Sequence, residues 1–343
     1  KTYTEPTQQD KDGYYLITSG AEMAWFFKNS RATAEGDTPK NYRLTTNVDL
    51  QGISFGRDDN RKFDGIFDGQ GYAIHNFGAQ QSNNSGGSYL FNEIKGTFKD
   101  LVLPKFWTGG LNGKSGFTQF LNGGQLINIR VHVTIATSSY AALVTYAGNN
   151  ALIDGVVVSG SVTSANDTGN AVGILNEMQD SGATVRNCVN YATINSNGNG
   201  NAAGIVAIVT GNTAGGTKLI ENCVNYGTVT ASRSGTYAGG ICATTISRTA
   251  DPMTFRNCVN YGTITHTHAS NGLAHGIAGV PTDNATGIAY FEGCVNYGEI
   301  SAYTQAGGIV SFSNHALHMT DCVNYGTIPA TTDAGGLAGK VNG

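Results

Sequence analysis

Charged residues, proline and long apolar runs are all scarce in this chain of 343 residues. Asp, Glu, Lys and Arg together account for 13% of it, and proline contributes 6 residues. Long helices draw on Glu, Lys and other strong helix formers, so a mainly helical fold is disfavoured. The formal net charge of -4 gives no electrostatic reason to bind nucleic acid or an anionic membrane. No apolar run reaches the roughly 18 residues that a transmembrane helix needs.

Glycine, by contrast, is abundant, with 48 positions, which is typical of many short strands joined by tight turns. The six cysteines do not resemble a disulfide framework, because five of them occupy one position of a repeat and only Cys242 stands apart. We therefore predict free, buried thiols that act as small apolar residues.

The block CVNY occurs five times and defines a repeat. It begins at Cys188, Cys223, Cys258, Cys294 and Cys322, in steps of 35, 35, 36 and 28 residues. Weaker copies place Phe77, Leu101, Ile129 and Val156 at the Cys position, which gives nine repeats. Between them recurs a second segment, AVGILNEM at 171 or YAGGICAT at 237, which predicts a strand whose internal glycines allow close packing. A third, less regular strand is expected in each repeat.

Repetition at this period is typical of a solenoid. We predict an all-β fold, a single-stranded right-handed parallel β-helix of about nine coils with a short N-terminal α-helical cap. Residues 1–62 would form the cap, continuous with the solenoid, and residues 63–343 the β-helix repeats. Within the cap, Tyr14–Ile17 reads as a strand, and Ser19 with Glu22 fits a capping box that opens a helix through about Asn29. Such a helix would cover the exposed core at the end of the solenoid.

Three columns of the repeat predict how the coils stack. The residue before the Cys position is always Asn, Asp or Gly, which predicts a left-handed bend there. Two positions before the Cys, charges alternate in sign along Asp154, Arg186, Glu221, Arg256 and Glu292, which favours direct register and a solvated ladder of ion pairs. Two positions after it, Asn190, Asn225, Asn260, Asn296 and Asn324 predict a structural ladder of stacked amides.

Catalytic and metal-binding patterns are weak, and we predict no catalytic residues, no metal site and no cofactor. The acids Asp58, Asp59, Asp64 and Asp68 lie close together in sequence but lack the alternating ligands of a calcium loop. His266 and His268 share a strand face without further ligands at zinc spacing. The protein is therefore expected not to be an enzyme.

The candidate binding residues form a column three positions after the Cys. It consists of Tyr191, Tyr226, Tyr261, Tyr297 and Tyr325, and by alternation it points outward together with the neighbouring valine column. Five coils at ~4.8 Å would make an aromatic stripe ~19 Å long, and soluble proteins seldom expose such a stripe without a partner. The other interpretation is that the rings only cover one another or lie beneath a loop.

The GGIV and GGLAG segments, the NCVNYGTI segments and the lead-in FDGIFDGQGYAIHNF resemble bacterial proteins with GLUG-motif repeats. The resemblance covers roughly residues 14–343. It implies a secreted or cell-surface, adhesin-like β-helix of the bacterial envelope. Residues 1–13 have no apolar h-region, so any leader is absent from this chain.

We therefore expect a non-catalytic protein that binds a glycan, or a host or bacterial surface protein, along its exposed flank. Two alternatives stay open: a carbohydrate-active β-helix enzyme, either a polysaccharide lyase or a hydrolase, and a passive structural stalk. Ligand identity, anchoring mode and oligomeric state cannot be read from the sequence.

Overall fold

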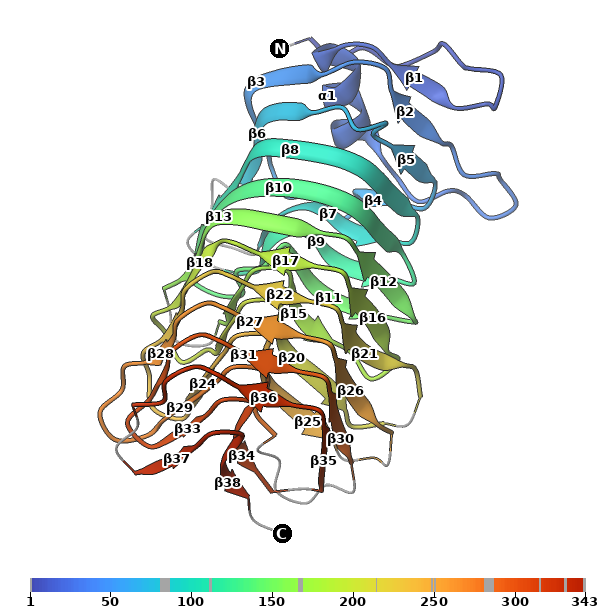
Figure 1. Ribbon diagram of the computed structural model, residues 1–343. Helices are drawn as coiled ribbons and strands as arrows, with labels where there is room; N and C mark the ends of the chain where they lie inside the picture. Colours follow the sequence, from blue (N-terminus) through green and yellow to red (C-terminus); the bar gives the residue numbers. More distant parts are fainter. Residues whose placement is uncertain are drawn as a thin grey trace.

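The chain forms a parallel β-solenoid of about ten turns with one short helix near its N-terminus (Figure 1). The computed structural model describes residues 2–80, 87–110, 113–165, 169–213, 215–247, 249, 251–280, 287–314, 316–329 and 332–341. The ribbon colours change steadily from blue to red along the solenoid axis, because each coil lies below the one before it (Figure 1). The predicted parallel β-helix is thereby confirmed.

Strands of successive coils pair in parallel, which merges equivalent strands into long sheets. The largest sheet contains β1 (Tyr15–Ile17), β2 (Tyr42–Leu44), β3 (Val48–Phe55), β5 (Ile66–Asp68), β6 (Ile74–Gln80), β8 (Thr97–Gly110), β10 (Gln125–Thr137), β12 (Ala151–Asp154), β13 (Val157–Ser164), β16 (Ala183–Arg186), β17 (Val189–Asn190), β18 (Thr193–Ser196), β21 (Lys218–Glu221), β22 (Val224–Asn225), β23 (Val229–Ala231), β26 (Met253–Arg256), β27 (Val259–Asn260), β28 (Ile264–His266), β30 (Ala289–Glu292), β31 (Val295–Asn296), β32 (Ile300–Ser301), β35 (Leu317–Thr320) and β36 (Val323–Asn324).

Three smaller sheets complete the coils. One contains β4 (Lys62–Phe63), β7 (Ser88–Ile94), β9 (Ser115–Asn122), β11 (Val144–Gly148), β15 (Leu175–Met178), β20 (Val206–Gly211) and β25 (Cys242–Ser247). The next contains β14 (Ala171–Val172), β19 (Ala202–Ala203), β24 (Thr236–Gly239), β29 (Gly272–His275), β33 (Gln305–Gly307) and β37 (Asp333–Gly335). The last pairs β34 (Val310–Ser313) with β38 (Ala338–Val341).

The tenth turn lies in the segment that the sequence assigned to the cap. Tyr42 of β2 pairs with Phe67 of β5, and Ile53 of β3 pairs with Phe77 of β6, so residues 42–55 form an additional coil. The pairing shifts between Asp49 and Ile53, where Gln51 and Gly52 both have a positive φ. This insertion breaks the spacing of the repeat, which is why the sequence pattern gave nine coils rather than ten.

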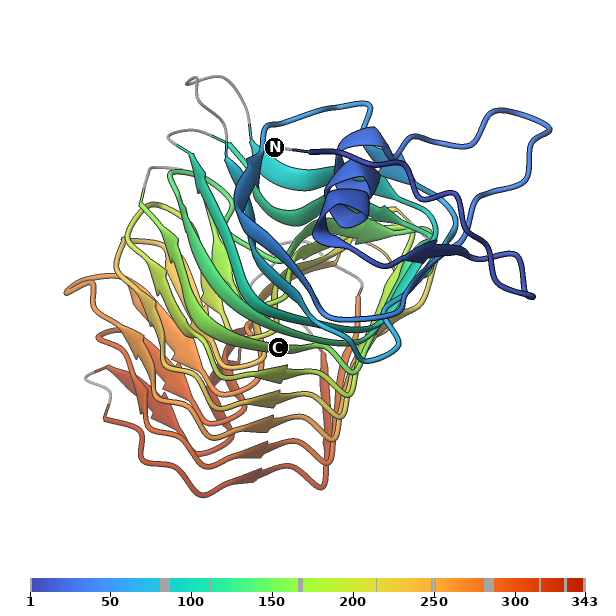
Figure 2. The ribbon, with the colours of Figure 1, turned by 90° about the horizontal axis from the view of Figure 1, so that it is seen from above.

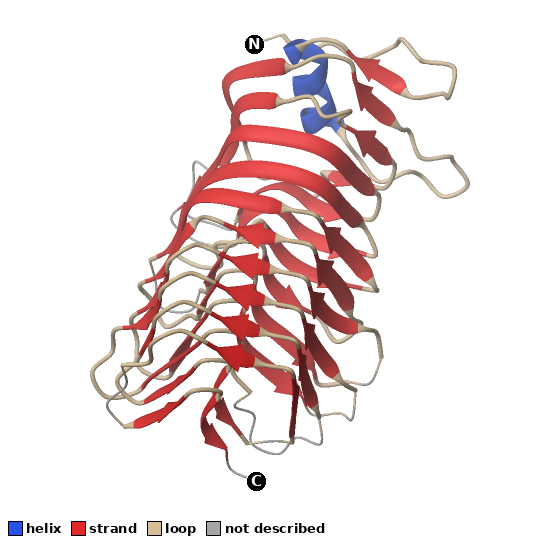
Figure 3. Cartoon of the chain, in the orientation of Figure 1, coloured by secondary structure: helices blue, strands red, loops and turns tan. Residues whose placement is uncertain are grey.

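The helix α1 (Gly20–Asn29) covers the N-terminal end of the core, as predicted. Figure 2, which looks down from above, shows α1 lying across the end of the solenoid, and Figure 3 shows it as the one helix drawn in the described chain. The Ser19 side chain accepts a hydrogen bond from the Glu22 N–H at 3.3 Å, and the Glu22 carboxylate accepts one from the Thr18 N–H at 2.7 Å. Phe26 and Phe27 of α1 are fully buried among core phenylalanines. The helix that the capping box begins therefore packs its apolar side chains against the end of the core.

One predicted Cys position is wrong: Phe77 pairs with Phe106, five residues after Leu101, because two additional residues between Asp68 and Ala73 shift the register. The bend before the Cys position is confirmed in the other eight repeats. Its φ lies between 50° and 68° at Asp100, Asn128, Gly155, Asn187, Asn222, Asn257, Gly293 and Asp321. These residue types enter the left-handed region at the lowest cost. The bend turns the residue at the Cys position inward. All six cysteines, Cys242 included, are free, and five of them are buried. The prediction of free thiols is therefore confirmed.

The charge ladder is confirmed on the outer face of the neighbouring strands. Arg186 Nε lies 2.8 Å from Asp154 Oδ2, and Arg256 bridges two coils, with Nε 2.7 Å from Glu292 Oε2 and Nη1 3.5 Å from Glu221 Oε2. These arginine side chains are about two-fifths exposed, so each pair contributes little stability. Its main effect is to favour the correct register.

The asparagine ladder runs through the interior. Each Nδ2 donates to the Oδ1 of the next asparagine at 2.8 Å, from Asn190 through Asn225, Asn260 and Asn296 to Asn324. The same Nδ2 also donates to the carbonyl two residues ahead, such as Gly262 O at 2.9 Å from Asn260. A buried amide is costly unless it is hydrogen-bonded, and here both of its polar atoms are satisfied.

Glycine lies against this ladder because nothing larger fits. A Cβ on Gly240 would lie 2.5 Å from Asn260 Oδ1 and 2.3 Å from the Gly276 carbonyl oxygen. Gly240 lies in the bend between β24 and β25, so the recurring AVGILNEM-type segment is two strands rather than one. The prediction that both recurring glycines lie inside a strand is therefore wrong for the second glycine, because the chain turns there around the amide.

We expect Asn260→Ala to lower the free energy of unfolding by about 1–3 kcal/mol, because the buried Asn225 Nδ2 and Asn296 Oδ1 each lose the hydrogen bond to Asn260. Urea unfolding followed by circular dichroism measures the change. Asn324→Ala is the matched control, since Asn324 is half-buried and has one neighbour in the ladder. Equal losses in the two variants would show that the ladder does not stabilise the solenoid.

We expect Gly240→Ala to cost about 1–3 kcal/mol through overpacking against the amide and the next backbone. Gly336 occupies the same column in the last coil, and a Cβ there would meet nothing within 4 Å. Gly336→Ala should therefore leave the urea midpoint almost unchanged. A Gly240→Ala variant as stable as Gly336→Ala would contradict this account of the glycine column.

Candidate functional site

The five predicted tyrosines form a continuous stack on the outside of the largest sheet. Each follows one of the two-residue strands β17, β22, β27, β31 and β36, which are labelled one below another in Figure 1. Ring centroids lie 4.8–5.1 Å apart, and the first four rings are within 4° of parallel to their neighbours. All five side chains are exposed, by 45–67%, so no described loop buries them. We call this column the tyrosine stack.

The stack offers ring edges and hydroxyls rather than ring faces. Because neighbouring rings are parallel and in contact, Tyr226, Tyr261 and Tyr297 have both faces covered. Within the part of the chain that the structure describes, none of the five hydroxyls has a hydrogen-bond partner. The interpretation that the rings cover one another is therefore correct for the inner three, and a sugar ring cannot stack on their faces.

Tyr191, at the N-terminal end of the stack, has a free ring face. Val158 pairs with Asn190 and Ser161 with Thr193, which places Ser159 beside Tyr191 in the preceding coil. Ser159 carries no ring, and Tyr191 is 54% exposed against 45–46% for the inner three. The Ser159 hydroxyl lies 3.0 Å from Nδ1 of His132 in the coil beyond. We call Tyr191, Ser159 and His132 the step.

Hydroxyl groups line the column next to the step. Thr134, Ser161 and Thr193 follow one another there in parallel register after Trp107, and Thr134 and Thr193 are exposed. A flat aromatic face surrounded by hydroxyl and imidazole groups can pack on the apolar face of a sugar and hydrogen-bond its hydroxyls.

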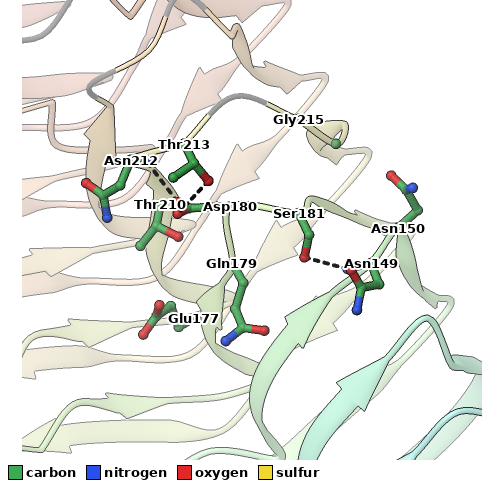
Figure 4. A pocket seen from close by; sticks show the side chains of 11 residues that line it. Asn149, Asn150, Glu177, Gln179, Asp180, Ser181, Thr210, Asn212, Thr213 and Gly215 are labelled. Carbon is green, nitrogen blue, oxygen red and sulfur yellow. Dashed lines mark hydrogen bonds between the residues drawn. The ribbon is translucent and has the colours of Figure 1, made fainter.

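A separate cleft of about 610 Å³ lies where the strands β11, β15 and β20 end (Figure 4). Its lining is polar and consists of Asn149, Asn150, Glu177, Gln179, Asp180, Ser181, Thr210, Asn212, Thr213, Gly215 and Gly216. Asp180 accepts hydrogen bonds from the Asn212 N–H at 2.8 Å and from the Thr213 hydroxyl at 3.1 Å. The Ser181 hydroxyl accepts one from the Asn149 N–H at 2.7 Å. These bonds tie the loops of three coils together around the cleft.

Glu177 and its neighbours give this region an unusual electrostatic environment. Glu177 pairs across the sheet with Tyr146, whose ring stacks on Phe120 at 5.3 Å and carries Lys114 Nζ 4.6 Å from its centroid. Burial, and to a lesser extent Asp180, raises the pKa of the Glu177 carboxyl above its usual value. Burial also raises the pKa of Tyr146 to about 12 and lowers that of Lys114. Perturbed groups beside a cleft are typical of ligand sites.

Sequence reasoning missed this cleft. Glu177, Tyr146 and Phe120 occupy one column, but that column holds a different residue type in each coil, so no repeated pattern marks it. The signal that was present is the single acidic residue, Glu177, in the mostly apolar segment AVGILNEM.

The other residues considered as metal ligands form hydrogen bonds and ion pairs within the chain. Asp59 binds Arg57 and the Tyr89 hydroxyl, and Asp64 accepts two hydrogen bonds from Thr33. His266 is buried against Thr236, and burial lowers its pKa to about 4. Across the described residues, no three His, Cys, Asp or Glu side chains are grouped as a metal site, and no helix is long and apolar enough to cross a membrane.

No protein-family model and no curated protein matches this chain. Among solved structures, the chain is similar to a "putative immunoglobulin A1 protease" from Bacteroides ovatus, with a TM-score of 0.47 and 15% sequence identity, over 97% of this chain and 86% of the other. At that identity the likeness concerns the β-solenoid fold alone. The resemblance to GLUG-motif proteins therefore stays a prediction.

Proposed function

We propose that this chain is a non-catalytic, adhesin-like β-solenoid of the bacterial cell surface or the extracellular space, and that it binds a glycan at the tyrosine stack. The resemblance to GLUG-motif repeat proteins suggests the location. The observation that carries the binding proposal is the free face of the Tyr191 ring, exposed at the end of a rigid aromatic column.

The chemistry of the step favours a sugar over a protein partner. A sugar ring presents an apolar C–H face and a rim of hydroxyls, which need a flat ring and nearby hydrogen-bonding groups. Tyr191 supplies the ring, while Ser159 and His132, 3.0 Å apart in the two preceding coils of the same column, supply donors and acceptors on the side of its free face. A protein interface of ordinary affinity would instead need a larger patch with apolar anchors in pockets.

The rest of the stack suits a polymer that continues beyond the step. Four further hydroxyls follow Tyr191 at the 4.8–5.1 Å spacing of the rings. An exposed polar column runs beside them and consists of Thr193, Thr228, Thr263, Glu299 and Thr327. The sheet holds these groups at fixed positions, so little conformational entropy is lost when a chain binds along them.

The test is a glycan array followed by isothermal titration calorimetry with the best ligand. We expect Tyr191→Ala to weaken binding by about tenfold, or ~1.4 kcal/mol, because it removes the free ring face. Tyr191→Phe keeps the face and should bind nearly as tightly as the original chain.

Tyr261→Phe is the comparison variant, because it removes one hydroxyl from the middle of the stack and leaves every ring in place; it should weaken binding less than Tyr191→Ala does. Unchanged binding by Tyr191→Ala would remove the step from the site. A chain that binds no glycan on the array would contradict the proposed function and favour the passive stalk.

A further inference from the structure

The cleft beside Glu177 contains several hydrogen-bonding groups with no partner in the described chain. The Glu177 carboxyl and the side-chain amides of Gln179, Asn150 and Asn212 accept or donate no hydrogen bond there. Asp180 and Ser181, in contrast, are held by the loop bonds described above. The cleft therefore combines a fixed rim with free groups that are available to a ligand.

The composition of the lining limits what can bind. It contains no Lys, Arg or His and includes two carboxyl groups, so it would repel an anion. It contains no apolar side chain, so it offers little to a hydrophobic molecule. Both Asp180 oxygens already accept hydrogen bonds from the loop, which leaves too few oxygen ligands for a calcium ion.

A neutral ligand with many hydroxyls satisfies these limits. Amides and carboxyls that each accept or donate several hydrogen bonds match the alternating donors and acceptors of a sugar. The volume of about 610 Å³ lies within the roughly 300–1,000 Å³ of ligand clefts and leaves room for more than one ring. Figure 4 shows these side chains arranged around one opening.

We propose that this cleft is a second carbohydrate site, which binds a neutral saccharide through Glu177, Gln179 and Asn212. It is independent of the tyrosine stack, because its residues belong to β15, β20 and the loops after β11, β15 and β20, whereas Tyr191 follows β17 in another sheet. The protein would then hold glycans at two separate faces of one rigid solenoid.

The test measures the binding of neutral monosaccharides and short oligosaccharides to the full chain, by saturation-transfer NMR and by isothermal titration calorimetry. The Asn212 N–H, not its side chain, holds Asp180, so Asn212→Trp fills the cleft without breaking that bond. We expect Asn212→Trp and Glu177→Ala each to weaken binding of the cleft's saccharide by about tenfold or more. Asn271→Trp, which adds the same ring to an exposed loop of another coil, should have no effect.

Combination with Tyr191→Ala separates the two sites. If both exist, the Tyr191→Ala chain keeps a saccharide signal that disappears when Asn212→Trp is added. The proposal is overturned if the Tyr191→Ala chain binds a saccharide and still binds it after Asn212→Trp is added. It is also overturned if the Tyr191→Ala chain binds no neutral saccharide. If Asn212→Trp alone abolishes all saccharide binding and Tyr191→Ala abolishes none, the cleft is supported as a saccharide site and the tyrosine stack is excluded as one. Circular dichroism of each variant verifies that it is folded.

Discussion

In-register stacking of parallel coils is the constraint on which this structure depends. Each residue of a coil lies one strand separation, ~4.8 Å, from its equivalent in the next. That distance lets one asparagine amide reach the next at 2.8 Å and brings tyrosine rings into contact at 4.8–5.1 Å. A one-residue slip would put the buried amides outside and the tyrosines inside. The loops vary in length, so the columns themselves must restore register in every coil.

The inner and outer columns meet this constraint differently. Inside, the amide ladder satisfies its own polar groups and forces glycine at Gly240 and its equivalents, because a Cβ would overlap Asn260. Outside, the alternating charges around Arg256 penalise coils that pair out of register. The buried amide ladder and the exposed charge ladder therefore favour the same register from opposite faces of one sheet.

Regular stacking also limits where a ligand can bind. Where the repeat is uniform, side chains cover one another, as the inner tyrosines do. Free surfaces arise where the repeat changes, at the step where Ser159 replaces tyrosine and in the cleft where three loops of different length meet. The proposed sites therefore lie at irregularities of the solenoid, while the regular columns provide rigidity.

The sequence by itself determined the solenoid, the bends before the Cys position, the charge and amide ladders, and the exposed tyrosine column, because each of these repeats with the period of the fold. It did not reveal the coil at Ile53, since a two-residue insertion hides it. Only the tertiary structure decided that the inner ring faces are covered while that of Tyr191 is free, and that Glu177 lies beside a cleft with Asn149 and Asn212. Those arrangements depend on how neighbouring coils and unrelated loops meet in space, and no residue pattern along one repeat contains that information.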